Sequence, residues 1–518
     1  MTPPQPSLRY TGQAPPPRFN LAGYCLGRAA ALTPAKTALF VIADAEAPLA
    51  AAEHWTYGAL DLAARRVAAG LLALGIEPGE RLMIRLPNTS DYALLFFGAI
   101  AAGIVPLPVS PQLTPSEADF LLADSGASAV ALAGGLPAPS ARGVRILDEA
   151  AIAALKAADP LPAYADTAAE DPGFLIYTSG TSRQPKGVLH AQRSAWGRRP
   201  MYRGWSAMGP NDVVLHAGAF NWSYTLGVGL TDPWANGATA VLYNGPRDIQ
   251  VWPKLIQATR ATLFAAVPSL YRQMLKYCAL APAELASLRH GLAAGEALPA
   301  ALLAEWRRRT GLEIYEALGM SECSTYVSTF PGMAIKPGSP GKPQPGRAIA
   351  ILPVEGGDQP LPAGETGLLA IHRDDPGLML GYWRRPAEEK LVYRGPWFVG
   401  GDLAAFDDEG YLWYHGRADD LMNAGGYRVS PVEVEAALAD HPDIAEVAVA
   451  EHAVRPDVSV IAAFVVARPG APKDAASILA QAESRLAAYK RPREVIFLDS
   501  LPRTANGKLL RRALAKSV

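Results

Sequence analysis

The segment Tyr177–Gly187, YTSGTSRQPKG, holds the residue types that bind phosphate groups. It follows an apolar run and contains four Ser or Thr hydroxyls, two glycines and one lysine. Hydroxyls and exposed backbone N–H groups of such a turn donate hydrogen bonds to phosphate oxygens, and Lys186 adds a positive charge. The segment lacks the GxxxxGK[ST] spacing of a Walker A loop. Taken alone, a loop of this composition is more often a solvated turn than a phosphate site.

Four further segments place charged and hydroxyl residues among glycines. In chain order they are Ala294–Ala297 (AGEA), Tyr315–Glu322 (YEALGMSE), Gly401–Asp402 with Gly416–Arg428 (GRADDLMNAGGYR), and Pro502–Lys508 (PRTANGK). With the first segment they resemble the ordered motifs of the adenylate-forming superfamily, which includes acyl-CoA synthetases, adenylation domains of nonribosomal peptide synthetases and luciferases. The resemblance covers nearly the whole chain from about Thr37, and it is strongest to the benzoate and medium-chain acid–CoA ligase branch. It implies an ATP-dependent ligase that forms acyl-AMP and then acyl-CoA.

The resemblance places the ATP phosphates along the first segment and beside Ser321 and Glu322. A carboxylate and a triphosphate repel each other, so their reaction needs positive charge and a metal ion on the phosphates. Glu322 is expected to bind Mg²⁺ and Ser321 to hydrogen-bond the α-phosphate, while Lys508 would stabilise the charge that develops between the two reactants. The expected catalytic residues are Thr178, Glu322 and Lys508. The expected phosphate contacts of the loop are Ser179, Gly180, Thr181, Ser182 and Lys186.

The first segment departs from the family pattern at Arg183, where a glycine is usual. Three interpretations stay open for this side chain. It lies in solvent, it orders the tip of the loop, or it contacts the outgoing pyrophosphate.

The adenosine part of ATP is expected to contact the next three segments. Glycine at position 295 lets the backbone approach a flat ring closely. The resemblance gives the adenine pocket as Gly295, Glu296, Ala297, Glu316, Ala317 and Leu318, with Glu316 receiving the adenine amino group. Asp402 would accept both ribose hydroxyls, because an ionised carboxylate accepts two donors at once. Arg417 and Arg428 would contact the ribose or the phosphates.

The last hundred residues are expected to form a lid that rotates after acyl-AMP has formed. By resemblance, Asp419 occupies the hinge position, whose backbone dihedrals absorb the rotation. Gly425 and Gly426 would then line the channel for the pantetheine arm of coenzyme A, since a narrow arm must pass close to backbone. Free coenzyme A is therefore the expected acceptor of the acyl group.

The acyl pocket is expected between an aromatic stretch and two of the motif loops, at Trp222, Ser223, Tyr224, Ala294 and Gly319. Acetate-activating relatives have a tryptophan where Gly319 stands, so glycine predicts room for a larger acid. Residues 219–224 contain no Asp or Glu, and a buried ammonium without a partner is costly, which argues against an α-amino acid. We expect an aromatic or a medium-chain carboxylic acid, with aromatic ahead. Trp222 and Tyr224 are equally compatible with a role in the core.

Three other interpretations share these motifs. The first is a stand-alone adenylating enzyme that loads a carrier protein instead of free coenzyme A. The second is a silent homologue that only binds ligands, which the intact Lys186, Glu322, Asp402 and Lys508 argue against. The third is a luciferase-like oxygenase, which shares the first half-reaction and is distinguished here by no residue.

The composition describes an ordinary globular protein. The chain has 518 residues, of which 50% are hydrophobic and 19% charged, and a formal net charge of −1. Near-neutral charge gives no footprint for nucleic acid or an anionic membrane. The partner that the resemblance implies is a small carboxylic acid. Cys25, Cys278 and Cys323 lie far apart, and no secretory signal is visible, which predicts a cytoplasmic protein. A homodimer stays open.

The pattern of apolar runs and turn residues predicts the elements that position these segments. The expected strands are Leu39–Ile42, Leu82–Arg85, Ala129–Leu132, Gly173–Tyr177, Asp212–Leu215 and Ala238–Leu242, and the expected helices are Leu60–Leu74, Tyr92–Ala102 and Ala300–Arg309. Strands separated by helices imply parallel sheets covered on both faces. Tyr92–Val109 is highly apolar but is broken by glycine and proline, so we expect a buried helix and a short strand there and no membrane span.

The predicted fold class is α/β with two domains. Residues 1–418 would form the large domain, with parallel-type sheets between helices, a β-rich subdomain after Gly364, and a loose proline-rich arm over the first 20 residues. Residues 419–518 would form a small mobile α+β lid. Its expected elements are a helix over Val429–Ala439, strands over Ile444–Ala450 and Ser459–Val466, a helix over Ala475–Ala488 and a strand over Glu494–Phe497.

Overall fold

The computed structural model describes residues 8–140, 143–178, 185–246, 248–420, 422–424, 427–455, 458–503 and 509–514. The chain separates into two compact units. The larger unit takes in the described parts of residues 5–349 and 371–396, and the smaller unit those of residues 350–370 and 397–518. Each unit is described by itself below. The predicted domain boundary between residues 418 and 419 stays a prediction.

A nine-stranded sheet forms the middle of the larger unit, in the order β15-β14-β13-β12-β11-β9-β10-β1-β2. The strands from β1 to β13 in this order run parallel, while β2, β14 and β15 pair antiparallel at the two edges. Their bounds are β1 Thr37–Ile42, β2 Glu53–Thr56, β9 Val213–His216, β10 Thr239–Tyr243, β11 Leu263–Ala266, β12 His290–Ala294, β13 Ile314–Met320, β14 Ser324–Ser328 and β15 Lys342–Pro343. Parallel strands need crossover connections, which explains the helices between them.

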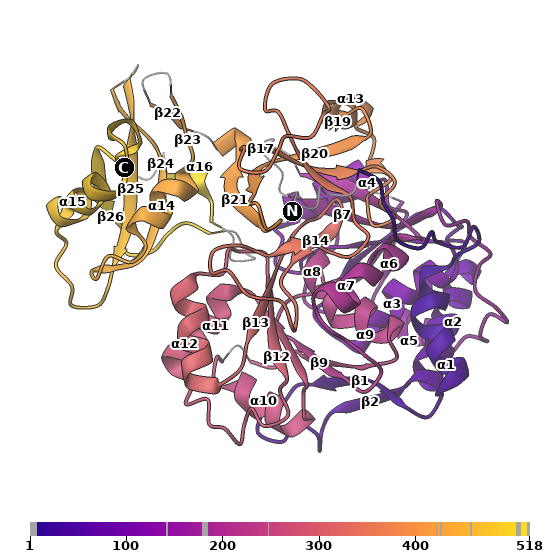
Figure 1. Ribbon diagram of the computed structural model, residues 1–518. Helices are drawn as coiled ribbons and strands as arrows, with labels where there is room; N and C mark the ends of the chain where they lie inside the picture. The colour runs from indigo at the N-terminus through magenta and orange to yellow at the C-terminus, as the bar shows by residue number, and fades with distance from the viewer. Residues whose placement is uncertain are drawn as a thin grey trace. The chain divides into compact units, whose positions relative to one another are not determined.

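Helices cover both faces of this sheet (Figure 1). Successive residues of β10 face opposite sides, so Ala240 and Leu242 pack with α2 and α3, whereas Val241 packs with α10, α11 and α12. The helices of this unit are η1 Gly23–Gly27, α1 Arg28–Leu32, α2 Tyr57–Ala73, α3 Ser90–Ala101, α4 Pro115–Ser125, α5 Glu149–Lys156, α6 Ser194–Gly197, α7 Arg199–Gly204, α8 Ser223–Leu226, η2 Gly227–Thr231, α9 Asp232–Ala235, α10 Val251–Thr259, α11 Pro268–Tyr277, α12 Ala300–Thr310 and α13 Pro386–Leu391.

A second, fully parallel sheet has the order β4-β3-β5-β6. Its strands are β3 Arg81–Arg85, β4 Val105–Pro108, β5 Ala129–Leu132 and β6 Arg145–Leu147. The apolar helix α3 is capped by Thr89, whose side chain accepts from the backbone N–H of Tyr92. Every residue of α3 except Asp91 is buried. Gly103, at φ +76°, turns the chain into β4. No helix among the described residues is long and apolar enough to cross a membrane.

A third, three-stranded antiparallel sheet carries the segment that opens the sequence analysis. Its order is β18-β8-β7, with β7 at Pro172–Thr178, β8 at Lys186–Ala191 and β18 at Gly381–Tyr382. The central strand β8 therefore pairs with a strand directly before it and with one almost 200 residues later. The two-residue strand β19, Tyr393–Arg394, also belongs to this unit.

The smaller unit contains two larger sheets and one short hairpin. Its first sheet takes in β16 Ile349–Leu352, β17 Gly367–His372, β20 Trp397–Phe406 and β21 Leu412–Arg417, and the hairpin is β22 Met422–Ala424 with β23 Tyr427–Val429. The second sheet, β24-β25-β26, comprises Ile444–Arg455, Val458–Ala467 and Glu494–Phe497. The helices are η3 Ala418–Asp420, α14 Pro431–Leu438, α15 Ala475–Arg485, η4 Ala488–Lys490 and α16 Arg511–Leu514. Side chains of α14, α15, β24 and β25 form one apolar core.

The predicted loose arm at the N-terminus is wrong for its described residues. The backbone N–H of Thr11 donates to the carbonyl of Gly346 at 2.9 Å, and that of Phe19 donates to Thr167 at 2.9 Å. The Phe19 side chain is buried in the main core, against Tyr24 and Trp196. Backbone pairing and one buried aromatic ring thus attach this proline-rich stretch to the larger unit.

Three buried histidines in the larger unit make its stability depend on pH. Burial lowers the pKa of His190 to about 4, that of His216 to about 3 and that of His290 to about 4. The unfolded chain takes up a proton at each histidine near pH 6.5, whereas the folded chain resists protonation until about pH 4. The free energy of unfolding therefore falls as the pH drops from 6.5, by about 2 kcal/mol per buried histidine at pH 5.

Replacing one of these histidines tests this origin of acid sensitivity. His290→Gln removes one titrating group. The loss of unfolding free energy between pH 7 and pH 5 should therefore be about 2 kcal/mol smaller in this variant than in the wild type. Urea unfolding at the two pH values measures the difference. His54→Gln is the control, since His54 is exposed, and should follow the wild type. Equal acid sensitivity of His290→Gln and wild type would contradict this account.

Candidate functional site

The β7–β8 hairpin fixes both ends of the predicted phosphate loop. Thr178, at the end of β7, pairs directly with Lys186, at the start of β8. The loop residues between them that were predicted to bind phosphate, Ser179, Gly180, Thr181 and Ser182, lie outside the described residues, as does Arg183. Antiparallel pairing therefore holds the predicted lysine and the first threonine at the base of this loop.

Lys186 lies in a cluster of polar side chains that includes the predicted metal ligand. Its ammonium forms an ion pair with Glu388 of α13 and lies 5.4 Å from the centre of the Tyr382 ring. The Tyr382 hydroxyl in turn donates to Glu322 Oε1 at 2.8 Å. Tyr382 is in place because β18 pairs with β8, where Tyr382 is opposite Val188. The structure thus brings Lys186 and Glu322 together through Tyr382, a residue that sequence analysis missed.

Two contacts hold the backbone of the Ser321–Glu322 turn. His190 Nε2 donates to the carbonyl of Ser321 at 2.8 Å, and the backbone N–H of Met379 donates to the carbonyl of Glu322 at 2.7 Å. His190 is neutral at pH 7, because burial lowers its pKa to about 4. It acts here as a fixed hydrogen-bond donor that positions a residue predicted to bind the α-phosphate. Sequence analysis missed His190 because a single histidine in an apolar strand carries no specific signal.

The predicted adenine residues gather at the carboxyl ends of two inner strands of the nine-stranded sheet. β12 and β13 are parallel neighbours, with Ala294 opposite Ala317, so the segments that follow them emerge side by side. The Glu316 carboxylate accepts from the backbone N–H of Leu298 at 3.0 Å, and burial raises the pKa of Glu316 to about 7. The Glu296 carboxylate accepts from the backbone and side chain of Ser269 at the start of α11, both at 3.2 Å. The structure places the predicted residues Gly295, Glu296, Ala297, Glu316, Ala317 and Leu318 here. The Glu296 carboxylate contacts the start of α11, and the Glu316 carboxylate contacts the loop after β12.

Three of the predicted acyl residues, Trp222, Ser223 and Tyr224, lie in α8 or directly before it. Trp222 and Tyr224 pack against the carboxyl end of β12 and the residue that follows it. A Cβ atom on Gly295 would lie 2.7 Å from the Trp222 ring, so the two residues are in direct contact. Tyr224 is buried beside Ala294 in an apolar cluster, with its ring 5.6 Å from that of Trp222. Tyr224 is therefore a core residue, while Trp222 is only partly buried against the same cluster. Ser223 faces a small buried cavity that His190 and Ser321 also line.

Gly319 does not open into free volume along its missing side chain. A Cβ atom there would lie 2.5 Å from the carbonyl oxygen of Ser324 and 2.7 Å from the Cα of Thr325, both main-chain atoms of β14. The pairing of β13 with β14 shifts register between Leu318 and Gly319. Close backbone approach is thus a second reason for glycine at this position, besides the size of the acid, and the place of Gly319 in an acyl pocket stays a prediction.

The predicted ribose residues lie in the smaller unit. Asp402 of β20 is opposite Arg417 of β21, with Arg417 Nη1 at 3.7 Å from Asp402 Oδ1. The Tyr414 hydroxyl donates to the same carboxylate oxygen at 3.1 Å. Arg417 also donates to the carbonyl of Gly400 at 2.6 Å. A buried aspartate with two fixed neighbours is suited to binding hydroxyl groups, because its rotamer is already held.

The remaining predicted residues of the smaller unit are described only in part. Asp419 lies in η3 and Arg428 in β23, and the structure describes the backbone of both. Gly425, Gly426 and Lys508 lie outside the described residues.

Glu322 fits a magnesium ion that is held mainly by a bound nucleotide. Within the described ranges, no group of three or more His, Cys, Asp or Glu side chains is arranged to hold a metal. Mg²⁺ commonly binds proteins through one or two carboxylates, with water and substrate phosphates as the other ligands. A single carboxylate linked to Lys186 through Tyr382 meets that requirement.

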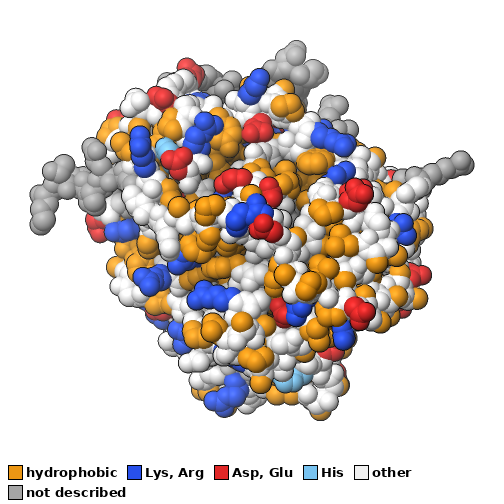
Figure 2. Space-filling model, turned by 90° about the vertical axis from the view of Figure 1, so that its right-hand side faces the viewer, with side chains coloured by type: hydrophobic (Ala, Val, Ile, Leu, Met, Phe, Trp, Pro, Cys, Tyr) orange, Lys and Arg blue, Asp and Glu red, His pale blue; other side chains and the backbone are white. Residues whose placement is uncertain are grey.

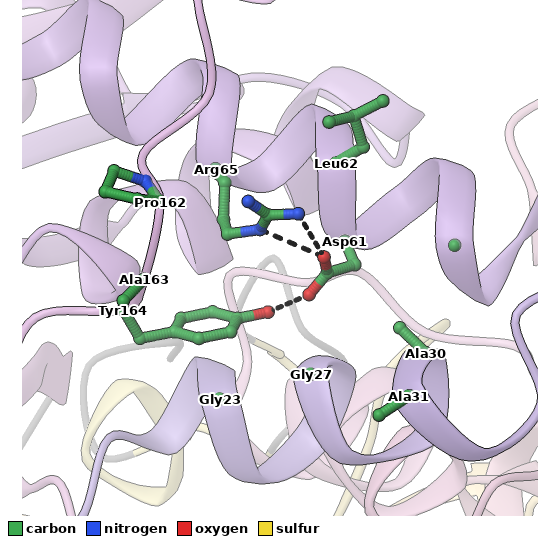
Figure 3. Close-up of a pocket in the computed structure, with 11 residues that line it drawn as sticks. Gly23, Gly27, Ala30, Ala31, Asp61, Leu62, Arg65, Pro162, Ala163 and Tyr164 are labelled. Atoms are coloured by element: carbon green, nitrogen blue, oxygen red, sulfur yellow. Dashed lines mark hydrogen bonds and ion pairs between the residues drawn. The ribbon is translucent and has the colours of Figure 1, made fainter.

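An open pocket of about 650 Å³ lies elsewhere in the larger unit, between η1, α1 and α2 (Figure 3). Its polar groups bond to one another, since Asp61 accepts from the Tyr164 hydroxyl and from Arg65 Nε at 3.0 Å. None of the predicted site residues lines it. On the face shown in Figure 2, acidic and basic side chains are interspersed with hydrophobic ones.

Comparison with known proteins identifies relatives over both units. The family described as "AMP-binding enzyme" matches residues 26–383, and the "AMP-binding enzyme C-terminal domain" matches residues 433–508. The benzoate–CoA ligase of Thauera aromatica is 33% identical, with 89% of this chain and 90% of the relative covered. The mitochondrial acyl-coenzyme A synthetase ACSM3 of Mus musculus is 30% identical over 89% and 84% of the two chains. A crystal structure of an anthranilate CoA ligase with anthranoyl-AMP has a TM-score of 0.85 at 28% identity, covering 97% of this chain and 98% of that one.

The contact between Gly295 and Trp222 can be tested with a matched pair of glycines. Gly295 has φ +92° and touches the Trp222 ring, whereas Gly311 has φ +71° and nothing within 4 Å of a Cβ position. Alanine at either site strains the backbone, but only Gly295→Ala also overlaps a ring. Gly295→Ala should therefore lower the free energy of unfolding by about 1–3 kcal/mol more than Gly311→Ala, measured in urea. Equal losses would show that Trp222 does not pack on this loop.

Proposed function

The chain belongs to the AMP-binding enzyme family, and we propose that it is specific for an aromatic, benzoate-like carboxylic acid or a medium-chain one. It is an AMP-forming acid–CoA ligase, which couples the acid to coenzyme A at the expense of ATP through an acyl-AMP. The observation that supports the site assignment most directly is the cluster of Lys186, Tyr382 and Glu322 at the base of the phosphate loop.

In the first half-reaction, a carboxylate oxygen of the acid attacks the α-phosphorus of ATP. The bond from that phosphorus to the bridging oxygen breaks, pyrophosphate leaves, and acyl-AMP remains. Lys186 would neutralise the triphosphate at the base of the loop, and Ser321 would donate to the α-phosphate from a turn that His190 holds. Glu322 is the residue that would hold Mg²⁺, which reduces the repulsion between the two anions when it is bound.

In the second half-reaction, the thiolate of coenzyme A attacks the acyl carbonyl and AMP leaves with the former carboxylate oxygen. We assign residues 419–518 to a lid that turns about Asp419 between the two steps. Lys508 on this lid would serve the first step, and Gly425 and Gly426 would border the thiol in the second. Asp402 would hold the ribose through both steps, since its carboxylate is already positioned by Tyr414.

The choice of an aromatic acid is supported by the relatives and by one local contact. Two of the similar proteins are named for benzoate and anthranilate, which are both aromatic acids. In this chain Trp222 packs edge-on to Tyr224 and against Gly295, so a flat apolar surface borders the loop between β12 and α12. A flat ring binds such a surface over a large area, whereas a flexible chain loses rotamer freedom on binding.

A panel of carboxylic acids tests this function. The purified enzyme is given ATP, Mg²⁺ and one acid at a time, with and without coenzyme A, and AMP release is measured. Benzoate-like acids should give the highest kcat/KM, followed by medium-chain acids, and sustained AMP release should require coenzyme A. Pyrophosphate exchange without any coenzyme A-dependent release of AMP would favour loading of a carrier protein. The absence of turnover with every acid would refute the ligase.

Replacing Lys508 separates the two half-reactions. Lys508→Ala should lower acyl-AMP formation by about 10²–10³-fold, as for loss of one preorganised donor in a transition state. Thioester formation from supplied acyl-AMP should largely survive, because this step takes place after the lid has turned. Rapid-quench assays of each half-reaction measure the two rates. An equal loss in both would exclude the assigned role of Lys508.

A further inference from the structure

The ammonium of Lys186 is paired with a carboxylate at the start of β8. Its partner, Glu388, lies in the first turn of α13, and its carboxylate contacts the ammonium directly. The pair is partly shielded, with side-chain exposures of 21% for Lys186 and 36% for Glu388. Ion pairs with this degree of exposure contribute only a modest attraction in water.

Glu388 is itself held in place from the opposite side. Arg385 Nε lies 3.7 Å from Glu388 Oε1, and Arg385 Nη2 is 2.6 Å from the Asp124 carboxylate. The Tyr177 hydroxyl, from the strand that leads into the phosphate loop, donates to the other oxygen of Asp124 at 2.6 Å. Glu388 therefore belongs to a network that is anchored on β7 as well as on α13.

The backbone also connects the start of α13 to β8. The N–H of Trp383 donates to the carbonyl of Gly187 at 2.8 Å, immediately beyond the β18–β8 pairing. Only two residues separate Trp383 from α13, so this hydrogen bond keeps the start of α13 close to β8. A triphosphate on Lys186 would thus lie close to the Glu388 carboxylate.

We propose that Glu388 is the counter-ion of Lys186 when no nucleotide is bound and that it competes with the ATP triphosphate, and with product pyrophosphate, for this ammonium. The proposal rests on the proposed function, because it takes Lys186 as a triphosphate contact. Competition for the ammonium and repulsion between like charges act in the same direction, so both weaken the binding of phosphate anions. The consequence is a nucleotide site that binds ATP less tightly but releases pyrophosphate more readily.

The test compares Glu388→Gln with wild type in equilibrium binding of MgATP and of magnesium pyrophosphate, by titration calorimetry without any acid. Glu388→Gln keeps the size of the side chain and removes its charge. It should tighten the binding of both anions by about two- to fivefold, the range that a partly exposed ion pair supplies. Glu389→Gln is the matched control on the same helix, since Glu389 faces Gly381, and should bind as wild type does.

Combining Glu388→Gln with Lys186→Met tests whether Glu388 acts through the lysine that also binds the phosphates. In Lys186→Met, Glu388→Gln should change MgATP affinity by much less than it does in the wild-type background. Weaker or unchanged binding by Glu388→Gln, or the same gain in both backgrounds, would overturn the proposal. If Lys186→Met alone leaves MgATP affinity unchanged, the assignment of Lys186 in the proposed function is at fault instead. Unfolding curves of all variants that match wild type confirm that the comparison concerns binding.

Discussion

The pairing of β8 with both β7 and β18 is the constraint on which the candidate site depends. One neighbour, β7, brings Thr178 opposite Lys186, and the other, β18, brings Tyr382 beside the same lysine and within hydrogen-bond distance of Glu322. A shift of this register by one residue would turn each of these side chains to the other face of the sheet. The chemistry needs positive charge and a carboxylate for a metal close together. The small sheet supplies Lys186, and its Tyr382 contacts Glu322 in the turn between β13 and β14.

The nine-stranded sheet supports the other half of the site by a different principle. Its strands β12 and β13 are parallel, so the loops at their carboxyl ends lie at one edge, where open α/β sheets commonly bind ligands. Gly295 and Trp222 meet there at a separation that admits no Cβ atom, and the Glu316 carboxyl is buried close by. The residues proposed for the nucleotide and for the acid are thus neighbours at the carboxyl ends of these strands.

The sequence predicted the fold closely wherever a segment carries its own periodic signal. The predicted strands Ala129–Leu132 and Glu494–Phe497 have the predicted bounds, and the apolar stretch after Thr89 is the expected buried helix followed by a short strand. β24 runs on to Arg455, beyond the predicted end at Ala450, because antiparallel pairing with β25 continues after the apolar run has ended. Hydrogen bonding, unlike hydrophobic periodicity, leaves no mark in one strand read alone.

The sequence predicted the motif residues of the candidate site, but it did not predict the residues that hold them in place. Lys186 and Glu322 were expected from ordered motifs, but His190, Tyr382 and Glu388 act through contacts that span from about 60 to about 200 residues along the chain. No local pattern marks such residues, since each is an ordinary side chain until the sheet brings it to its partner. At Gly319 the structure adds a reason that the sequence does not show, because the backbone of β14 approaches the position of a Cβ atom.

The central claim is that the carboxylate of the acid attacks the α-phosphorus of ATP and that AMP then leaves with one of its oxygens. The most direct measurement uses an acid whose carboxylate oxygens carry the heavy isotope of oxygen, with mass spectrometry of the AMP and pyrophosphate formed during complete turnover with coenzyme A. The account predicts one labelled oxygen in AMP and none in pyrophosphate. Unlabelled AMP, or label in a phosphate other than that of AMP, would contradict it.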